Sequence, residues 1–168
     1  SEFRLQAVPS RVNAELQNLK NFNLRHSRSL PSFPHSGFPT IFRPVQFQKV
    51  TIIGVGLLGG SLGLAIKQRQ LAAKVDGYVR RNATISECEK FSVVDHATLD
   101  LARAVENADL IILCTPLSRM RELAEQMLPA IKPGAIVTDV GSVKASVVQE
   151  LEPIFARAKA HFIGSHPM

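Results

Sequence analysis

Three glycines near residue 55 have the spacing of a phosphate-binding turn. They follow a short β-branched run, VTII at 50–53, with the pattern G-x-G-x-x-G, and a helical pattern of apolar residues begins directly after them. In such a turn the first glycine permits the tight bend, the second lets backbone approach a pyrophosphate, and the third lets helix pack on strand. Amides at the helix start then face the phosphates. The segment predicts a dinucleotide site formed by Gly54, Gly56, Leu57, Leu58 and Gly59.

The next strand-like run, VDGYVRR at 75–81, bears on which dinucleotide is preferred. An NAD site usually has Asp or Glu at the end of this strand to bind the ribose 2′-hydroxyl. Val79 falls there instead, followed by Arg80 and Arg81, and Asp76 comes too early, inside the strand. An arginine pair without a competing carboxylate suits a 2′-phosphate. We therefore expect a preference for NADP; the alternative is a solvated basic turn with NAD bound less selectively.

A histidine and a serine follow two later strand-like runs, where ligands bind in parallel sheets. His166 lies in the segment GSHPM, and its imidazole could accept the proton of a substrate hydroxyl during alcohol oxidation. A His-Pro pair in a loop is otherwise more often structural. Ser142, in TDVGSVK, is also well placed to be the N-cap of a helix beginning at Val143.

Other polar residues at these strand ends have narrower expected roles. Thr115 and Pro116 would bound the ribose region of the cofactor, and Asp139 would end its strand and tie loops together. Lys144 could bind a substrate carboxylate, although a solvated lysine is an equal alternative. Neither the cysteines nor the histidines have the spacing of a metal site, and none is expected.

The elements that would position these residues alternate between strand and helix from residue 48 onward. The strands are apolar runs without in/out alternation, which is typical of a parallel sheet covered by helices on both faces. We expect an α/β, doubly wound, Rossmann-type domain with strand order 3-2-1-4-5-6. The expected strands are 50–54, 74–79, 93–94, 109–114, 135–140 and 161–164, and the expected helices are 57–70, 83–91, 99–107, 119–131 and 143–158.

Charge and composition exclude several classes of protein. The 168 residues carry a formal charge of +6, but seven of the 20 basic side chains and two of the 14 acidic ones lie in 1–49, so the remainder is close to neutral. No basic stripe with interleaved aromatics appears there, which argues against a nucleic-acid partner. No apolar run is long enough for a membrane helix. Cys88 and Cys114 are expected to be free thiols.

Residues 1–48 differ from the rest of the chain. Prolines at 31, 34, 39 and 44 oppose regular structure, so we expect a poorly structured extension, followed by a dinucleotide-binding domain at 49–168. The extension is either an organellar transit segment, which would place the protein in plastids, or residues added upstream of the natural start, which leaves a cytoplasmic protein.

Four segments together resemble the signature of one enzyme family. GVGLLGGSLGLAIK, LCTP, TDVGSVK and FIGSHPM occur in the order and approximate spacing of the prephenate/arogenate dehydrogenases, over residues 49–168. The resemblance implies NAD(P)-dependent oxidative decarboxylation of prephenate or arogenate in tyrosine biosynthesis. It implies that His166 accepts a hydrogen bond from the 4-hydroxyl as base or polariser. Ser142 would orient that histidine beside the nicotinamide, and both would contact substrate.

In that family the motif continues into a helical domain that makes the dimer and supplies further substrate contacts. This chain ends at Met168, so we expect a fragment lacking that domain, inactive alone, from a protein that is a homodimer. Two alternatives stay open: another Rossmann dehydrogenase of 3-hydroxyacid or 6-phosphogluconate type, and a non-catalytic NADP-binding or sensing module.

Overall fold

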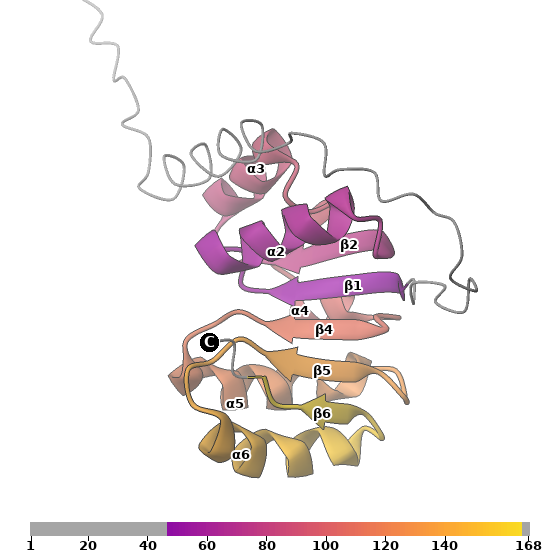
Figure 1. The fold of residues 1–168 in the computed structure, drawn as a ribbon, viewed down its shortest axis with the longest axis vertical. Helices are drawn as coiled ribbons and strands as arrows, with labels where there is room; N and C mark the ends of the chain where they lie inside the picture. Colours follow the sequence, from indigo (N-terminus) through magenta and orange to yellow (C-terminus); the bar gives the residue numbers. More distant parts are fainter. Residues whose placement is uncertain (1–46, 166–168) are drawn as a thin grey trace, which may run out of the picture. The chain divides into compact units, whose positions relative to one another are not determined.

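A single parallel sheet organises the chain in the computed structural model, which describes residues 47–165. Its strand order is β3-β2-β1-β4-β5-β6, and every pair of neighbours is parallel. Figure 1 shows the strand arrows pointing the same way. The strands are β1 (Phe47–Ile53), β2 (Ala72–Tyr78), β3 (His96–Thr98), β4 (Leu110–Leu113), β5 (Ile136–Asp139) and β6 (His161–Ile163). The α/β doubly wound fold and the predicted order are confirmed.

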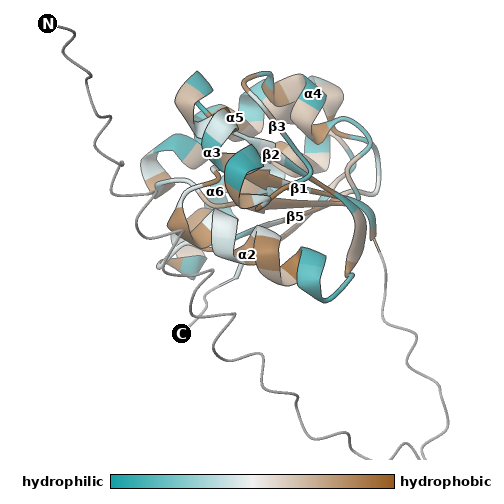
Figure 2. Cartoon of the chain, turned by 90° about the horizontal axis from the view of Figure 1, so that it is seen from above, coloured by the Kyte–Doolittle hydropathy of each residue, from teal (hydrophilic) through white to brown (hydrophobic). Residues whose placement is uncertain are grey.

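The central strands form because their residues are apolar on both sides. In β1, Val50, Ile52 and Ile53 are all buried, and in β4 Ile111 and Leu113 are buried as well. A strand with both faces covered has no solvent side to favour polar residues, which explains the continuous runs in the sequence. Figure 2 shows this centre as brown strands, while the surrounding helices mix brown and teal.

The helices form two layers around the sheet. Figure 1 shows α2 in front of the sheet and α4 behind it. α5 packs on both α4 and α6, whereas α2 contacts β1 and β2, and α3 contacts β3. The bounds are α2 (Leu57–Gln68), α3 (Asn82–Phe91), α4 (Leu101–Val105), α5 (Leu117–Met127) and α6 (Lys144–Arg157), with a 3₁₀ turn, η1, at Leu128–Ala130.

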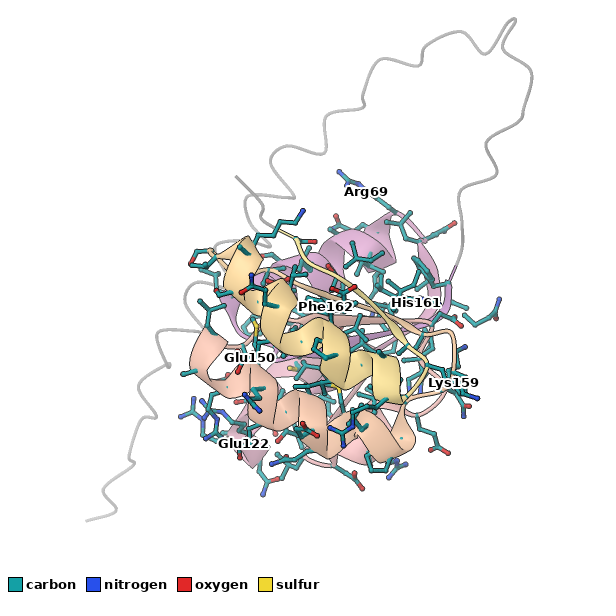
Figure 3. The ribbon with its side chains drawn as sticks, turned by 90° about the horizontal axis from the view of Figure 1, so that it is seen from below. Arg69, Glu122, Glu150, Lys159, His161 and Phe162 are labelled. Atoms are coloured by element: carbon teal, nitrogen blue, oxygen red, sulfur yellow. The ribbon has the colours of Figure 1, made fainter. Side chains whose placement is uncertain are left out.

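The largest apolar cluster lies between the sheet and the α4–α6 layer. Met120 and Met127 of α5 and Leu151 and Phe155 of α6 are fully buried in it. The ring of Phe155 stacks on that of Phe162 in β6, with centroids 5.6 Å apart. Figure 3 shows Phe162 beneath α6, and α5 lying alongside α6. This layer therefore fixes where β5 and β6 end.

Two element predictions are corrected. The third strand is β3 at His96–Thr98, not 93–94. Val93 and Val94 are apolar because both are buried, 0% and 4% exposed; the backbone carbonyl of Val93 lies against Gly63 of α2, and the Val94 side chain packs against Gly77 of β2. The helix expected at 119–131 begins at Leu117 and tightens into η1.

Further bounds differ slightly from those expected. β1 begins at Phe47, which pairs with Ala72, so the sheet starts ahead of residue 49. The expectation for residues 1–46 lies outside the described residues. Across 47–165, every helix is too short or too polar to cross a bilayer.

Candidate functional site

The predicted site residues that the structure describes follow strand ends that lie level at one edge of the sheet. Register pairs Ile53 with both Tyr78 and Leu113, and Leu113 with Asp139. The residue that directly follows each of three strands, which we call its exit residue, is still hydrogen-bonded to a neighbouring strand. The bonds are Gly54 N to Tyr78 O at 3.0 Å, Cys114 N to Ile53 O at 2.8 Å, and Val140 N to Leu113 O at 3.1 Å. The five exits that follow β1, β2, β4, β5 and β6 thus share the carboxyl edge, on the left in Figure 1.

The glycine turn has the geometry that its spacing predicts. Gly54 has a φ of +96°, a conformation that favours glycine. A β-carbon at Gly59 would lie 2.3 Å from the Gly54 carbonyl oxygen, so helix and turn are in direct contact there. A β-carbon at Gly56 would meet nothing within 4 Å. The turn therefore leaves open space in front of the α2 amides, where a pyrophosphate would approach.

Four helices begin at this edge without an acidic residue in the first turn or a side chain capping the end. They are α2, α3, α5 and α6. By contrast, Asp100 caps the short helix α4 by accepting from Arg103 N at 3.0 Å. Each uncapped start presents unsatisfied N–H groups and the positive end of the helix dipole. The edge is consequently suited to anions.

The end of β2 carries free cations and no available carboxylate. Asp76 is buried, 3% exposed, and bound by Lys49 at 3.1 Å and Lys74 at 2.9 Å. Arg80 and Arg81 are exposed, and within residues 47–165 their guanidinium groups take part in no hydrogen bond or ion pair. The prediction that Asp76 lies inside the strand is confirmed.

The end of β4 packs beneath the glycine turn. A β-carbon at Gly54 would lie 2.8 Å from the Cys114 carbonyl oxygen and 2.9 Å from Thr115 Cγ2. Thr115 Oγ1 is buried without a hydrogen-bond partner among the described residues, and Pro116 is exposed. Burial raises the pKa of the Cys114 thiol to about 12. Cys114 and Cys88 are both free, and Cys114 is a neutral part of the floor of the turn.

The ends of β5 and β6 are joined by one buried carboxylate. Asp139 accepts from Gly141 N at 2.7 Å through Oδ2 and from Ser165 N at 3.1 Å through Oδ1. The prediction that Asp139 ends its strand and ties loops together is confirmed. Thr138 Oγ1 lies 2.7 Å from Ser165 Oγ. The sequence gives no signal for this hydroxyl contact, because it depends on the β5–β6 register.

The predicted N-cap role of Ser142 is wrong. Helix α6 begins at Lys144, its N-cap is Val143, and no side chain caps it. Val143 is still extended, with φ −133° and ψ 108°, so the helix starts one residue later than a Ser142 cap requires. Ser142 is exposed at the carboxyl edge.

Lys144 and the segment before His166 lie side by side. Lys144 Cγ is 3.6 Å from the position of a β-carbon on Gly164, and Val148 Cγ2 is 2.3 Å from it. Gly164 is therefore pressed against the first turns of α6. His166 itself lies outside the described residues; it follows Ser165 directly in the chain.

Large apolar side chains also gather at this edge. All six of the exposed large hydrophobic residues in 47–165 lie at or just after a strand end: Leu57, Leu58, Leu99, Leu117, Val143 and Ile163. Exposed apolar side chains that concentrate at one edge are more typical of a binding surface than of surface that stays in contact with water. Within the same residues, no cluster of three or more His, Cys, Asp or Glu side chains could hold a metal ion.

Comparison with known proteins agrees with this arrangement. The family model "Prephenate dehydrogenase, nucleotide-binding domain" matches residues 62–168. The chain is 34% identical over 122 residues to a prephenate dehydrogenase of Lactococcus lactis, covering 72% of this chain and 34% of that protein. The crystal structure of prephenate dehydrogenase from A. aeolicus, in complex with hydroxyphenyl propionate and NAD+, is 31% identical, with a TM-score of 0.65 over 72% of this chain and 42% of that one.

An arogenate dehydrogenase is similar to a comparable degree. The structure of the Synechocystis enzyme is 33% identical, with a TM-score of 0.63, and the match covers 71% of this chain and 40% of that one. The chain thus spans about a third of the length of the curated relatives it matches. Because the family model matches more than half of the chain, the chain belongs to the prephenate dehydrogenase family and contains its nucleotide-binding domain.

Proposed function

We propose that the protein containing this chain oxidises and decarboxylates prephenate or arogenate with an NAD(P) cofactor, in tyrosine biosynthesis. The observation that carries the proposal is the shared edge: Ser165, directly before His166, is bonded to Asp139 at the same sheet edge as the glycine turn. A dinucleotide whose pyrophosphate lies on the α2 amides would bring its nicotinamide toward these residues.

The reaction needs a proton acceptor and an acceptor for two electrons. Bound NAD(P)+ would take the hydride from C4 of the substrate ring. His166 would take the proton of the 4-hydroxyl, which leaves a ring carbonyl. The ring carboxylate then leaves as CO2, its bonding electrons enter the ring, and the carbonyl oxygen takes up a proton to give a phenol. Aromatisation drives the step. The hydroxyphenyl compound bound with NAD+ in the A. aeolicus relative supports an aromatic product of this type.

The uncapped helix starts at the edge support a carboxylate substrate beside a dinucleotide. Helix α6 begins uncapped with Lys144 in its first turn, next to Gly164. We assign to Lys144 the binding of a substrate carboxylate, and to Ser142 the orientation of His166. Leu57 and Leu58 would line the path of the dinucleotide, and Thr115 and Pro116 would contact its ribose.

We further propose that NADP is preferred over NAD. The exposed Arg80 and Arg81 favour a 2′-phosphate over a 2′-hydroxyl, and the carboxylate of Asp76 is occupied by its ion pairs with Lys49 and Lys74. That the complete protein is a homodimer in the cytoplasm stays a prediction, as does the boundary of the domain at residue 49.

The test uses the complete protein with prephenate or arogenate and NADP+, followed by the absorbance of NADPH. We expect turnover with at least one substrate. His166→Asn should lower kcat by about 10²–10⁴-fold, the usual weight of general acid–base catalysis, with cofactor affinity unchanged. Binding of NADP without turnover of either substrate would instead favour a sensing module, and near wild-type turnover by His166→Asn would remove the histidine from the mechanism.

A further inference from the structure

Asp139 holds two separate loops with its two oxygens. Its side chain is fully buried at the end of β5. Oδ2 binds the amide of Gly141, one residue before Ser142, and Oδ1 binds the amide of Ser165, one residue before His166. Because both bonds end on one planar carboxylate, the loop after β5 and the segment after β6 cannot shift independently.

A pair of hydroxyl groups strengthens the same junction. Thr138 Oγ1 donates to the Ile163 carbonyl oxygen at 2.7 Å and accepts from Ser165 Oγ at 2.7 Å. The exit of β6 is therefore bonded to the last two residues of β5, through the Thr138 hydroxyl and through the Asp139 carboxylate.

Packing leaves little room for either loop to move. A β-carbon at Gly141 would lie 2.8 Å from Asp139 Oδ2 and 2.7 Å from Leu117 Cδ2. Gly164 is held as closely by Val148 of α6. Neither position has room for a β-carbon, so only glycine fits there. The two loops therefore approach the carboxylate and α6 as closely as backbone allows.

We propose that Asp139 is a positioning residue, which fixes the separation of Ser142 and His166 by holding the backbone before each of them. The catalytic part of this inference rests on the proposed function. An asparagine in its place would keep one acceptor oxygen, but its amide NH2 would face the N–H of Gly141 or Ser165. Asp139→Asn therefore breaks one of the two connections while keeping the shape of the side chain.

The connection itself is measured on the chain without any assay of activity. Hydrogen exchange of at least one of the two amides, that of Gly141 or that of Ser165, should become about tenfold faster in Asp139→Asn, by the loss of a charge-assisted hydrogen bond. Exchange in the glycine turn should not change. Unchanged exchange at both Gly141 and Ser165 would overturn the proposal, whatever the protein catalyses.

The consequence for catalysis is measured on the complete protein. Asp139→Asn should lower kcat by about 10–100-fold, the scale expected for a misplaced catalytic group, with the Kd for NADP within about twofold of wild type. The matched control is Asp109→Asn, since Asp109 also accepts from two backbone amides, those of Gln48 and Lys49, but at the opposite edge of the sheet. It should lose stability and keep its kcat.

A second variant covers the case in which Asp139→Asn does not fold. Thr138→Val keeps the volume and removes the contacts to Ile163 and Ser165, and we expect a fall in kcat of about 3–10-fold at unchanged NADP affinity. A faster amide exchange with unchanged kcat in both variants would overturn the positioning role while the proposed function stands. If the wild-type protein turns over neither substrate, the proposed function fails. The amide-exchange result then still shows whether Asp139 holds the backbone at Gly141 and Ser165.

Discussion

At the scale of single residues, two glycines of the same turn differ in whether they have room for a methyl group. A methyl group at Gly56 meets nothing within 4 Å, and its φ of −91° suits alanine. A methyl group at Gly59 meets the Gly54 carbonyl oxygen at 2.3 Å. The first position is open toward a ligand, and the second is closed by the protein itself.

We therefore expect Gly56→Ala to keep the free energy of unfolding and to raise the Kd for NADP by about tenfold, or 1.4 kcal/mol. Gly59→Ala should lower the free energy of unfolding by about 1–3 kcal/mol, because the turn must move, despite the gain in helix propensity. Chemical denaturation and cofactor fluorescence titration measure the two effects. Equal loss of stability in both variants would contradict this account of the turn.

The expected preference for NADP over NAD also depends on single residues, Arg80 and Arg81. Replacing both Arg80 and Arg81 with alanine should lower kcat/KM for NADP by about 10–100-fold, since hydrogen bonds to charged groups contribute about 1.5–3 kcal/mol each. The value for NAD should change little. Arg69→Ala is the control, because Arg69 is an exposed arginine at the far end of α2. A parallel loss with both cofactors would show that the pair does not read the 2′-phosphate.

At the scale of elements, Asp109 joins the start of the sheet to its neighbours. Its carboxylate accepts from Gln48 N at 2.6 Å and Lys49 N at 3.0 Å, and it pairs with Lys132 in the loop before β5. The hydrogen bond from Lys132, then those from the Lys49 and Gln48 amides, outweigh the effect of burial and lower the pKa of Asp109 below its usual value. One carboxylate thus connects the start of β1 to the loop before β5 at the amino edge of the sheet.

The lowered pKa of Asp109 in the folded state determines how its contribution to stability changes with pH. Asp109 stabilises the fold above the unfolded pKa of about 3.9, and this contribution is lost as the pH falls through the folded value. The stability difference between wild type and Asp109→Asn should therefore be clear at neutral pH and shrink as the pH falls below the unfolded pKa of about 3.9. Urea denaturation at both pH values measures it. A difference that is the same at both would contradict the assignment.

Strands, helices and turns could be predicted from the sequence wherever a residue pattern is produced by only one kind of local structure. The apolar runs of β1 and β4 and the glycine turn meet that condition, so the topology and the turn are confirmed. Val93 and Val94 mislead because burial in the segment before β3 looks the same in sequence as burial inside a strand. The start of α6 depends on the extended Val143, and the Thr138–Ser165 contact on strand register, which no local pattern contains.

At the scale of the whole domain, the two edges of the sheet are built differently. The carboxyl edge has uncapped helix starts, two arginines that pair with no other residue in 47–165, and exposed apolar side chains. The amino edge has Asp109 and its partners, which satisfy one another. The first edge matches a dinucleotide, which has anionic phosphates and planar apolar ring faces, and the second edge does not.

The most direct test of this account is titration of the chain with NADP+, followed through its backbone amide NMR signals. We expect the largest shifts at residues 54–59, at Arg80 and Arg81, and at 115, 141–143 and 165, all at the carboxyl edge. Amides around Gln48, Asp109 and Gly134 should stay unchanged. Shifts concentrated at that second group, or shifts in the glycine turn without any at 141–143 and 165, would contradict a single edge that holds both the cofactor and the reacting residues.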